Sequence, residues 1–148
     1  MYIFLDVDGV LNTEEDWKRR KYSLNNACVT AFCRLLSCLH EPKVILSSTW
    51  RNGIARDGTT AVHIDDLLKA LEPAGIMFLD KTGIAPDGSR TKEIDFYLRR
   101  HPEERYIILD DDPTLFDQQK NTPHLYLTSS KTGLTDADVD RILKKINQ

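Results

Sequence analysis

The sequence predicts a three-layered α/β fold, in which helices cover both faces of a five-stranded parallel sheet. Short runs that are apolar on nearly every residue alternate with amphipathic segments along the chain. Strands of this kind are typical of parallel sheets that are buried on both sides. No repeat, low-complexity tract or linker divides the 148 residues. We therefore expect a single domain that covers residues 1–148.

Five runs have the length and composition of strands: Tyr2–Leu5, Lys43–Leu46, 76–79, 105–109 and 124–127. In open α/β sheets, ligands bind beyond the carboxyl ends of the strands, where the loops converge. The residues that directly follow each strand are therefore the first candidates for a functional site.

Four segments carry apolar residues at helical spacing: 24–39, 63–71, 91–100 and 135–146. Ser23 or Asn25 is expected to cap the first of these helices, and Pro102 should end the third. Thr135 and Asp138 resemble a capping box, which predicts where the last helix begins.

Composition and charge exclude several classes of protein. The net charge of −3 and the pI near 5.8 lack the basic field of a dedicated nucleic-acid binder, so a polyanion would have to meet a local patch. The apolar opening is too short for a signal peptide, and no run approaches the length of a membrane span. Cys28, Cys33 and Cys38 recur at steps that rotate by roughly 140° around a helix, so they are expected to remain free thiols. We expect a cytoplasmic protein without membrane partners.

Polar residues of an unusual kind follow three of the strands. They are Asp6 and Asp8 after the first, Ser47 to Thr49 after the second, and Asp110 to Asp112 after the fourth, with Arg90 and Lys92 at the start of the third helix. Each group alone is explained by a turn, a strand end, a solvated helix face or a helix cap. Together at one edge of the sheet, clustered carboxylates repel one another unless a cation lies among them, and oxygen ligands suit Mg²⁺.

The same segments resemble a known family. DVDGVLN at 6–12, VILSSTWR at 44–51, the Arg90 and Lys92 pair and IILDDDP at 107–113 are similar to the four motifs of the haloacid dehalogenase (HAD) superfamily. The wording SSTWR, the run GSRTKEIDFYL and the ending TGLTDADV more closely resemble the small HAD domains of Swiss Army knife RNA-repair proteins. The resemblance implies a Rossmann-like core and a Mg²⁺-dependent phosphatase that forms an aspartyl-phosphate.

The resemblance also implies catalytic roles. Asp6 would attack phosphorus, and Asp8 would protonate the leaving oxygen and later activate water. Mg²⁺ would be held by Asp6, the backbone carbonyl of Asp8 and Asp110, with Asp111 or Asp112 acting through water.

Two further roles have more than one candidate. Ser48 would bind the phosphoryl oxygens, with Thr49 or Ser47 as alternatives, and a cation from Arg90 or Lys92 would stabilise the transferring group.

The surroundings of the site suggest a class of substrate. Many HAD enzymes insert a cap domain, but the spacing here leaves room for a minimal cap at most, so the site should be open. Residues 17–22, which we call the flap, contain four positive charges between two aromatic residues. The charges would attract phosphates and the rings would stack on a nucleobase, or the flap is an ordinary solvated loop. Thr49, Trp50 and Arg51 are expected to contact the substrate.

A nucleotide or an RNA or DNA end is the leading substrate. A small-metabolite phosphatase and a non-catalytic phosphate-binding module are the alternatives.

Overall fold

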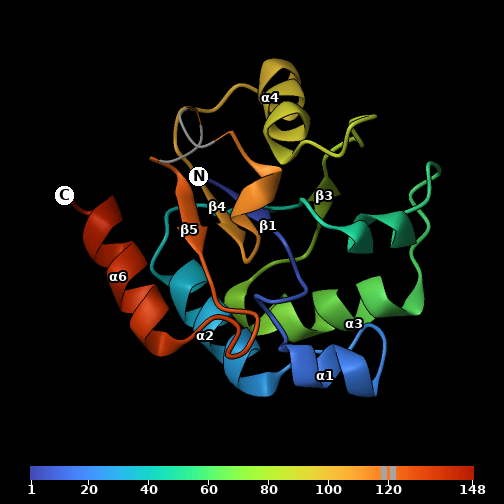
Figure 1. The fold of residues 1–148 in the computed structure, drawn as a ribbon, viewed down its shortest axis with the longest axis vertical. Coiled ribbons are helices and arrows are strands. Elements are labelled where there is room, and N and C mark those ends of the chain that lie inside the picture. The colour runs from blue at the N-terminus through green and yellow to red at the C-terminus, as the bar shows by residue number, and fades with distance from the viewer. Residues whose placement is uncertain (118–119, 121–122) are drawn as a thin grey trace.

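The computed structural model, which describes residues 1–117, 120 and 123–148, contains one parallel sheet with the strand order β3-β2-β1-β4-β5 (Figure 1). The strands are β1 (Tyr2–Leu5), β2 (Lys43–Leu46), β3 (Asp80–Lys81), β4 (Tyr106–Asp110) and β5 (Leu125–Leu127). All four pairings are parallel. The α/β class and the five-stranded parallel sheet that the sequence predicts are therefore confirmed.

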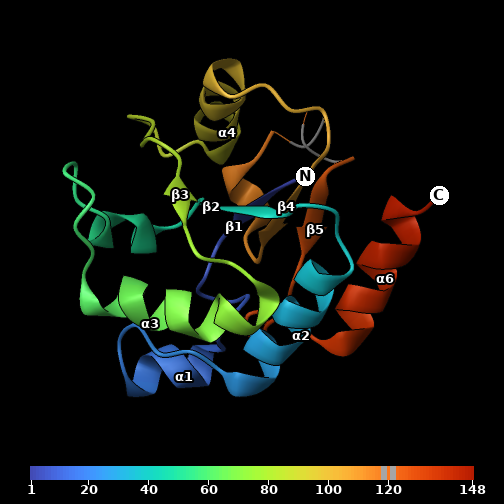
Figure 2. The same cartoon turned by 180° about the vertical axis from the view of Figure 1, so that it is seen from behind.

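Helices cover both faces of this sheet. The described helices are α1 (Glu14–Arg19), α2 (Asn26–Ser37), α3 (Val62–Leu71), α4 (Arg90–Arg100) and α6 (Asp136–Ile146). Figures 1 and 2 show α2, α3 and α6 on one side of the sheet and α4 on the other. The chain therefore has the three layers expected from its alternating pattern.

The central strand β1 shows why a strand covered on both faces is apolar at successive residues. Ile3 and Leu5 belong to a large core that also contains residues of α2, α3 and α6. Phe4 points to the other face, where it joins Ile94 and Tyr97 of α4 in a second core. Because successive side chains of a strand face opposite ways, a sheet covered on both sides needs apolar residues at both sets of positions.

The third strand differs from the prediction. The sequence predicts it at residues 76–79, whereas the structure pairs Asp80–Lys81 with β2. Within the apolar run, Ile76 and Leu79 are buried, but Met77 and Phe78 are exposed. The strand lies at the edge of the sheet, where two residues of pairing suffice and polar side chains reach solvent. The apolar run packs beside the sheet rather than within it.

Helix α1 was not predicted from apolar periodicity. Thr13 caps it, and Thr13 and Asp16 form a capping box in which each side chain accepts from the other's backbone amide. This six-residue helix is the only helix described between β1 and α2, and Figures 1 and 2 both show it beside α3. The insertion after the first strand is therefore a short helix with its flanking loops.

The three cysteines are free. Cys28 donates its Sγ hydrogen to the carbonyl of Thr132 (3.4 Å), and Cys33 donates to the carbonyl of Ala70 (3.6 Å), while Cys38 is exposed. Among the helices of the described ranges, none combines the length and the apolar character that crossing a membrane requires.

Candidate active site

Three carboxylates meet at the carboxyl edge of the sheet. Leu5 of β1 pairs with Leu109 of β4, so Asp6 and Asp110, the next residues along, lie beside each other. The Asp6 amide donates to the Leu109 carbonyl at 3.0 Å, which continues the ladder. Carboxylate oxygens of Asp6, Asp110 and Asp111 all lie within 4.8 Å of one another. The register of two strands thus creates the acidic cluster that the sequence predicts.

The charge of Arg90 does not balance the three carboxylates of this cluster. Burial raises the pKa of Asp6 well above its usual range, and the charges of Asp110 and Asp111 raise it further, whereas Arg90 lowers it. Burial likewise raises the pKa of Asp110 to about 7, against a hydrogen bond from the Asp112 amide and the charge of Arg90. A divalent cation among these oxygens would remove the repulsion, so the carboxylates fit Mg²⁺.

Asp111 and Asp112 have different positions. Asp111 belongs to the cluster, and its carboxylate lies against Gly9, where an added Cβ would collide with it. Gly9 also has a φ of 86°, which glycine adopts without strain. Asp112 is turned to the next 3₁₀ turn, where its carboxylate accepts from the amide (2.9 Å) and hydroxyl (2.6 Å) of Thr114. Of the two alternatives for the second acidic residue, the structure places Asp111 at the site.

Asn12 holds the loop that carries Asp8, and the sequence did not indicate this role. Its Nδ2 group donates to Asp8 Oδ1 (2.9 Å) and to the carbonyl of Ser23 (2.8 Å), while its Oδ1 accepts from the Gly9 amide (3.0 Å). Asn12 is fully buried. An amide side chain with both donors and an acceptor so close to an Asp-x-Asp-Gly turn was the available signal.

Trp50 and Arg51 lie elsewhere than expected. Both were predicted to contact the substrate, but the Trp50 side chain is fully buried and only 5% of Arg51 is exposed. The indole Nε1 of Trp50 donates to Asp8 Oδ1 at 3.0 Å. Arg51 donates from both terminal nitrogens to Glu93 (3.0 and 3.2 Å). Both side chains are therefore buried against polar partners inside the protein, whereas contact with a substrate led us to expect them at the surface.

The residues after β2 occupy three environments. Leu46 pairs with Leu5, so Ser47 follows β2 at the level of Asp6, and its buried hydroxyl has no hydrogen-bond partner among the described residues. The Ser48 hydroxyl caps the 3₁₀ turn Thr49–Gly53 by accepting from the Trp50 amide (3.1 Å), which leaves its own hydrogen able to donate. Thr49 is exposed. Both buried serines thus keep an O–H group that can donate.

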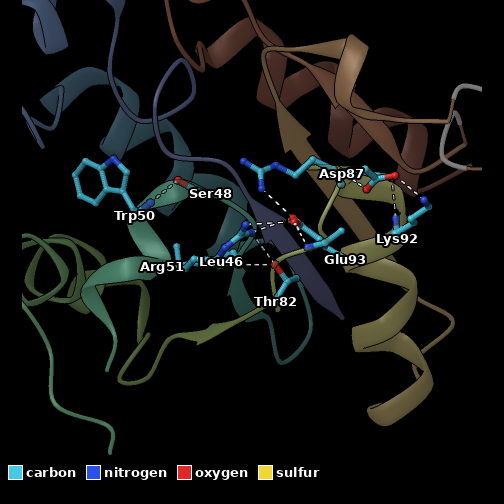
Figure 3. Close-up of polar contacts among 11 residues, drawn as sticks. Leu46, Ser48, Trp50, Arg51, Thr82, Asp87, Lys92 and Glu93 are labelled. Carbon is cyan, nitrogen blue, oxygen red and sulfur yellow. Dashed lines mark hydrogen bonds and ion pairs between the residues drawn. The ribbon is translucent and has the colours of Figure 1, made fainter. Parts of the chain in front are cut away.

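The two candidate cations, Arg90 and Lys92, differ in their surroundings. Arg90 is buried, and its charge acts on both Asp6 and Asp110. Lys92 is exposed and forms an ion pair with Asp87 at 2.5 Å. Figure 3 shows that pair on the far side of Glu93 from Ser48 and Trp50. The structure therefore brings Arg90, and not Lys92, to the carboxylates.

Glu93 anchors Arg90 in a buried network, and Figure 3 shows its contacts with Arg51 and the nearby Thr82. Its Oε1 accepts from Arg90 at 2.9 Å and from Arg51 at 3.0 Å, and its Oε2 accepts from the Ala85 amide at 2.8 Å. Burial alone would raise the pKa of Glu93, but the hydrogen bonds from Ala85, Arg90 and Arg51 bring it below its usual range. Arg51 also donates to Thr82 (3.1 Å). Two guanidinium groups on one carboxylate leave a net positive charge beside the acidic cluster.

A pocket of about 340 Å³ opens beside Asp8. It is lined by Asp8, Trp17, Lys21, Tyr22, Thr49 and Asn52. The Tyr22 ring stacks on His63 with 3.7 Å between ring centroids, and the Lys21 ammonium lies 4.9 Å from the Tyr22 centroid. The flap thus contributes two aromatic rings and a cation to a cavity of the size that small ligands occupy.

The sequence matches one family model over residues 2–139, described as "HAD domain in Swiss Army Knife RNA repair proteins". The chain belongs to this family. The match covers most of the 148 residues and includes all the site residues described above. Comparison with curated proteins and with solved structures returned no match for the chain.

This HAD domain brings most of the predicted site residues to one edge of its sheet. Asp6, Asp110 and Asp111 meet, and Arg90 acts on the first two. Asn12 and Glu93 are the additions that only the folded chain reveals, because each acts by holding a neighbour.

Proposed function

We propose that this HAD domain is a Mg²⁺-dependent phosphomonoesterase that forms an aspartyl-phosphate on Asp6. The observation that carries the proposal is the cluster of Asp6, Asp110 and Asp111 oxygens within 4.8 Å of one another. Buried Arg90 lies close enough to act on two of these carboxylates. HAD domains generally use Mg²⁺, and an acidic cluster beside a buried cation suits phosphoryl transfer, in which charge accumulates on the transferring group.

The carboxylates of Asp6 and Asp110 and the backbone carbonyl of Asp8 would hold the ion, with Asp111 acting through water. When bound, Mg²⁺ supplies positive charge that offsets the repulsion between the phosphate and these carboxylates. The protein's own residues position the substrate. The Nε of Arg90 is buried and has no hydrogen-bond partner among the described residues. The same is true of the Ser47 hydroxyl. These donors, together with the O–H of Ser48, suit the phosphoryl oxygens.

The reaction proceeds in two displacements. A carboxylate oxygen of Asp6 attacks phosphorus and forms a P–O bond, while the bond to the leaving oxygen breaks and that oxygen takes a proton from Asp8. Asp8, now a carboxylate, accepts a proton from a water molecule as its oxygen attacks phosphorus. The bond between phosphorus and the Asp6 oxygen breaks, and inorganic phosphate is released. Asp6 and Asp8 then return to their initial states. Asp8 therefore donates one proton and recovers one in each cycle.

The substrate we propose is a nucleotide or the phosphorylated end of RNA or DNA. The pocket is lined by Asp8, the proposed acid, so the leaving group would lie there, and its lining also contains the rings of Trp17 and Tyr22 and the cation of Lys21. Aromatic rings stack nucleobases, and lysine attracts neighbouring phosphates. The description of the family, which concerns RNA-repair proteins, agrees with this class of substrate. A reducing cytoplasmic location is part of the proposal and is supported by the three free thiols.

Asp6→Asn tests the reaction. The amide keeps the shape of the side chain but lacks the nucleophile's charge, so turnover should fall by about 10³-fold or more while the thermal midpoint does not drop. EDTA should silence the parent, Mg²⁺ should restore it, and Ca²⁺, which accepts looser coordination, should support little turnover. Activity of Asp6→Asn within about tenfold of the parent, or full activity in EDTA, would contradict the proposal.

The substrate class is tested separately, with a panel of phosphorylated metabolites and of 3′- and 5′-phosphorylated oligonucleotides in Mg²⁺. A preference for a sugar or acid phosphate would favour a small-metabolite phosphatase. Binding of inorganic phosphate without turnover of any ester would favour a non-catalytic phosphate-binding module.

A further inference from the structure

Trp50 is the largest fully buried side chain of the described residues; it belongs to the large core, and its indole nitrogen reaches Asp8 at the site. Its indole packs against the rings of Tyr22 and His63, each at 5.3 Å between centroids and nearly perpendicular to it. Its amide donates to the Ser48 hydroxyl, and His63 Nε2 lies 3.4 Å from its carbonyl oxygen. Contacts on both ring and backbone leave the indole a single position.

This fixed indole donates its one N–H group to Asp8. The distance from Nε1 to Asp8 Oδ1 is 3.0 Å, and Asn12 Nδ2 donates to the same oxygen at 2.9 Å. The second oxygen, Asp8 Oδ2, accepts no hydrogen bond from any residue in the described ranges. Asp8 itself is partly exposed and lines the pocket beside the flap. The two oxygens of one carboxylate are therefore distinguished: two N–H donors hold one, and the other is free.

We propose that Trp50 is a positioning residue for the protonation of the leaving group, and that Asp8 Oδ2 is the atom that carries the proton. The inference rests on the proposed role of Asp8 as acid and base. Oδ1 faces two N–H donors, so a proton placed there would meet two hydrogens, and the proton belongs on Oδ2. A buried indole N–H group without an acceptor costs free energy, so the hydrogen bond between Trp50 and Asp8 fixes the position of both side chains.

The arrangement explains why a large aromatic residue follows the second motif without touching solvent. A ring that stacks on a substrate base needs an exposed face, whereas the Trp50 side chain has no exposed surface. Its N–H group instead reaches across from the loop after β2 to the loop after β1. General acid catalysis depends on the acid lying within hydrogen-bond reach of the leaving oxygen, so a small shift of Asp8 reduces it.

Trp50→Phe removes the N–H group and keeps an aromatic ring. Two substrates of nearly equal shape isolate the proton transfer: p-nitrophenyl phosphate, whose phenolate leaves without a proton, and p-nitrobenzyl phosphate, whose alkoxide needs one. The parameter to compare is kcat/KM, because it covers the steps up to departure of the leaving group and excludes the later hydrolysis. We expect Trp50→Phe to lower kcat/KM about tenfold for the benzyl ester and less than about threefold for the phenyl ester.

Asp8→Asn provides the reference, because it removes the acid altogether. It should show the same difference between the two esters with a larger loss, about 10²-fold or more for the benzyl ester. Replacement of Trp50 by 3-benzothienylalanine, which keeps the bicyclic shape and exchanges N–H for sulfur, covers the case in which Trp50→Phe does not fold. Its thermal midpoint should stay within a few degrees of the parent's, and it should reproduce the difference between the esters.

Equal losses on both esters, for Trp50→Phe or for the benzothienyl variant, would show that Trp50 acts only through packing and would overturn the positioning role. A strong difference for Asp8→Asn with none for the Trp50 variants would have the same meaning and leave the proposed function intact. If Asp8→Asn changed neither ester, the proposed role of Asp8 would fail first.

Discussion

Two charged clusters share the carboxyl edge of the sheet, and they are balanced in different ways. The basic cluster contains its own counter-ion, because the Glu93 carboxylate accepts from both Arg51 and Arg90. In the acidic cluster of Asp6, Asp110 and Asp111, the charge of Arg90 lowers the pKa values of Asp6 and Asp110, but burial and mutual repulsion raise both pKa values by more.

This difference in charge balance indicates which of the two clusters binds a ligand. A network in which the carboxylate of Glu93 pairs with both guanidinium groups fixes the position of Arg90 and contributes to folding. A cluster that is left short of positive charge is destabilising alone and becomes favourable when a cation binds. Substitutions in the two clusters should therefore change stability in opposite directions.

The largest effect is expected in the basic cluster. Glu93→Gln keeps the shape but leaves two buried guanidinium groups without a charged partner, so the free energy of unfolding should fall by about 3 kcal/mol. Urea denaturation measures this change. Glu15→Gln is the matched control, because Glu15 forms an ion pair with Arg19 at the surface and should leave the midpoint nearly unchanged. A Glu93→Gln protein as stable as the parent would show that the network contributes no net stabilisation.

The sequence predicted strands β1 and β2 to the residue, because each ends in three successive apolar residues, Ile3–Leu5 and Val44–Leu46, directly followed by a polar one. It missed α1, whose six residues have no apolar periodicity and whose only signal is the Thr13 and Asp16 capping box. It misplaced β3 because an edge strand needs no apolar residues, so the nearby apolar run drew the assignment.

For the site, the sequence identified the reactive carboxylates better than the residues that hold the site in position. The carboxylates follow strands whose ends are legible in the pattern, so Asp6 and Asp110 could be placed together. Whether Trp50 faces solvent or the interior depends on contacts with Tyr22 and His63, which are far away in the chain. Glu93 also pairs across elements, and no local pattern indicates such a pairing.

A smaller effect of opposite sign is expected in the acidic cluster. Asp110→Asn keeps the acceptor for the Asp112 amide but removes one of the crowded charges. In metal-free buffer near pH 8, the free energy of unfolding should therefore rise by about 1 kcal/mol, the equivalent of roughly one unit of pKa shift. The stabilisation that Mg²⁺ gives the parent, ~2.7 kcal/mol at a hundred times the Kd, should disappear together with turnover.

The stability difference between Asp110→Asn and the parent should depend on pH in a defined direction. The pKa of Asp110 is raised to about 7, so its protonated form stabilises the metal-free fold at low pH, and this contribution is lost as the pH rises through about 7. The advantage of Asp110→Asn over the parent should consequently grow between about pH 5 and pH 8. Asp112→Asn is the control, because Asp112 is turned away to Thr114 and should give no such gain. A constant difference across this range would show that burial and repulsion do not make the charged form of Asp110 unfavourable in the metal-free protein.

The smallest effect is expected in the flap, where exposed charges lie outside both clusters. If the flap binds a polynucleotide, replacing Lys18 and Lys21 by Gln should raise KM for a phosphorylated oligonucleotide several-fold and leave KM for p-nitrophenyl phosphate almost unchanged, because only the long substrate reaches both residues. A pair of changes on exposed helix surfaces, Lys69→Gln with Lys144→Gln, controls for net charge alone.

Salt concentration should separate the two substrates in the same way. Contacts with single-stranded phosphates make affinity fall with salt at a log-log slope of about −0.7 per contact, so the oligonucleotide should respond steeply and the double flap variant should lose more than one unit of slope. A small ester held mainly at the acidic cluster should respond weakly, because its phosphate is bound where solvent ions have little access. Equal responses of both substrates to the flap variant and to salt would mean that Lys18 and Lys21 are solvated charges without a role in binding. The small-metabolite phosphatase would then be the better description of this HAD domain.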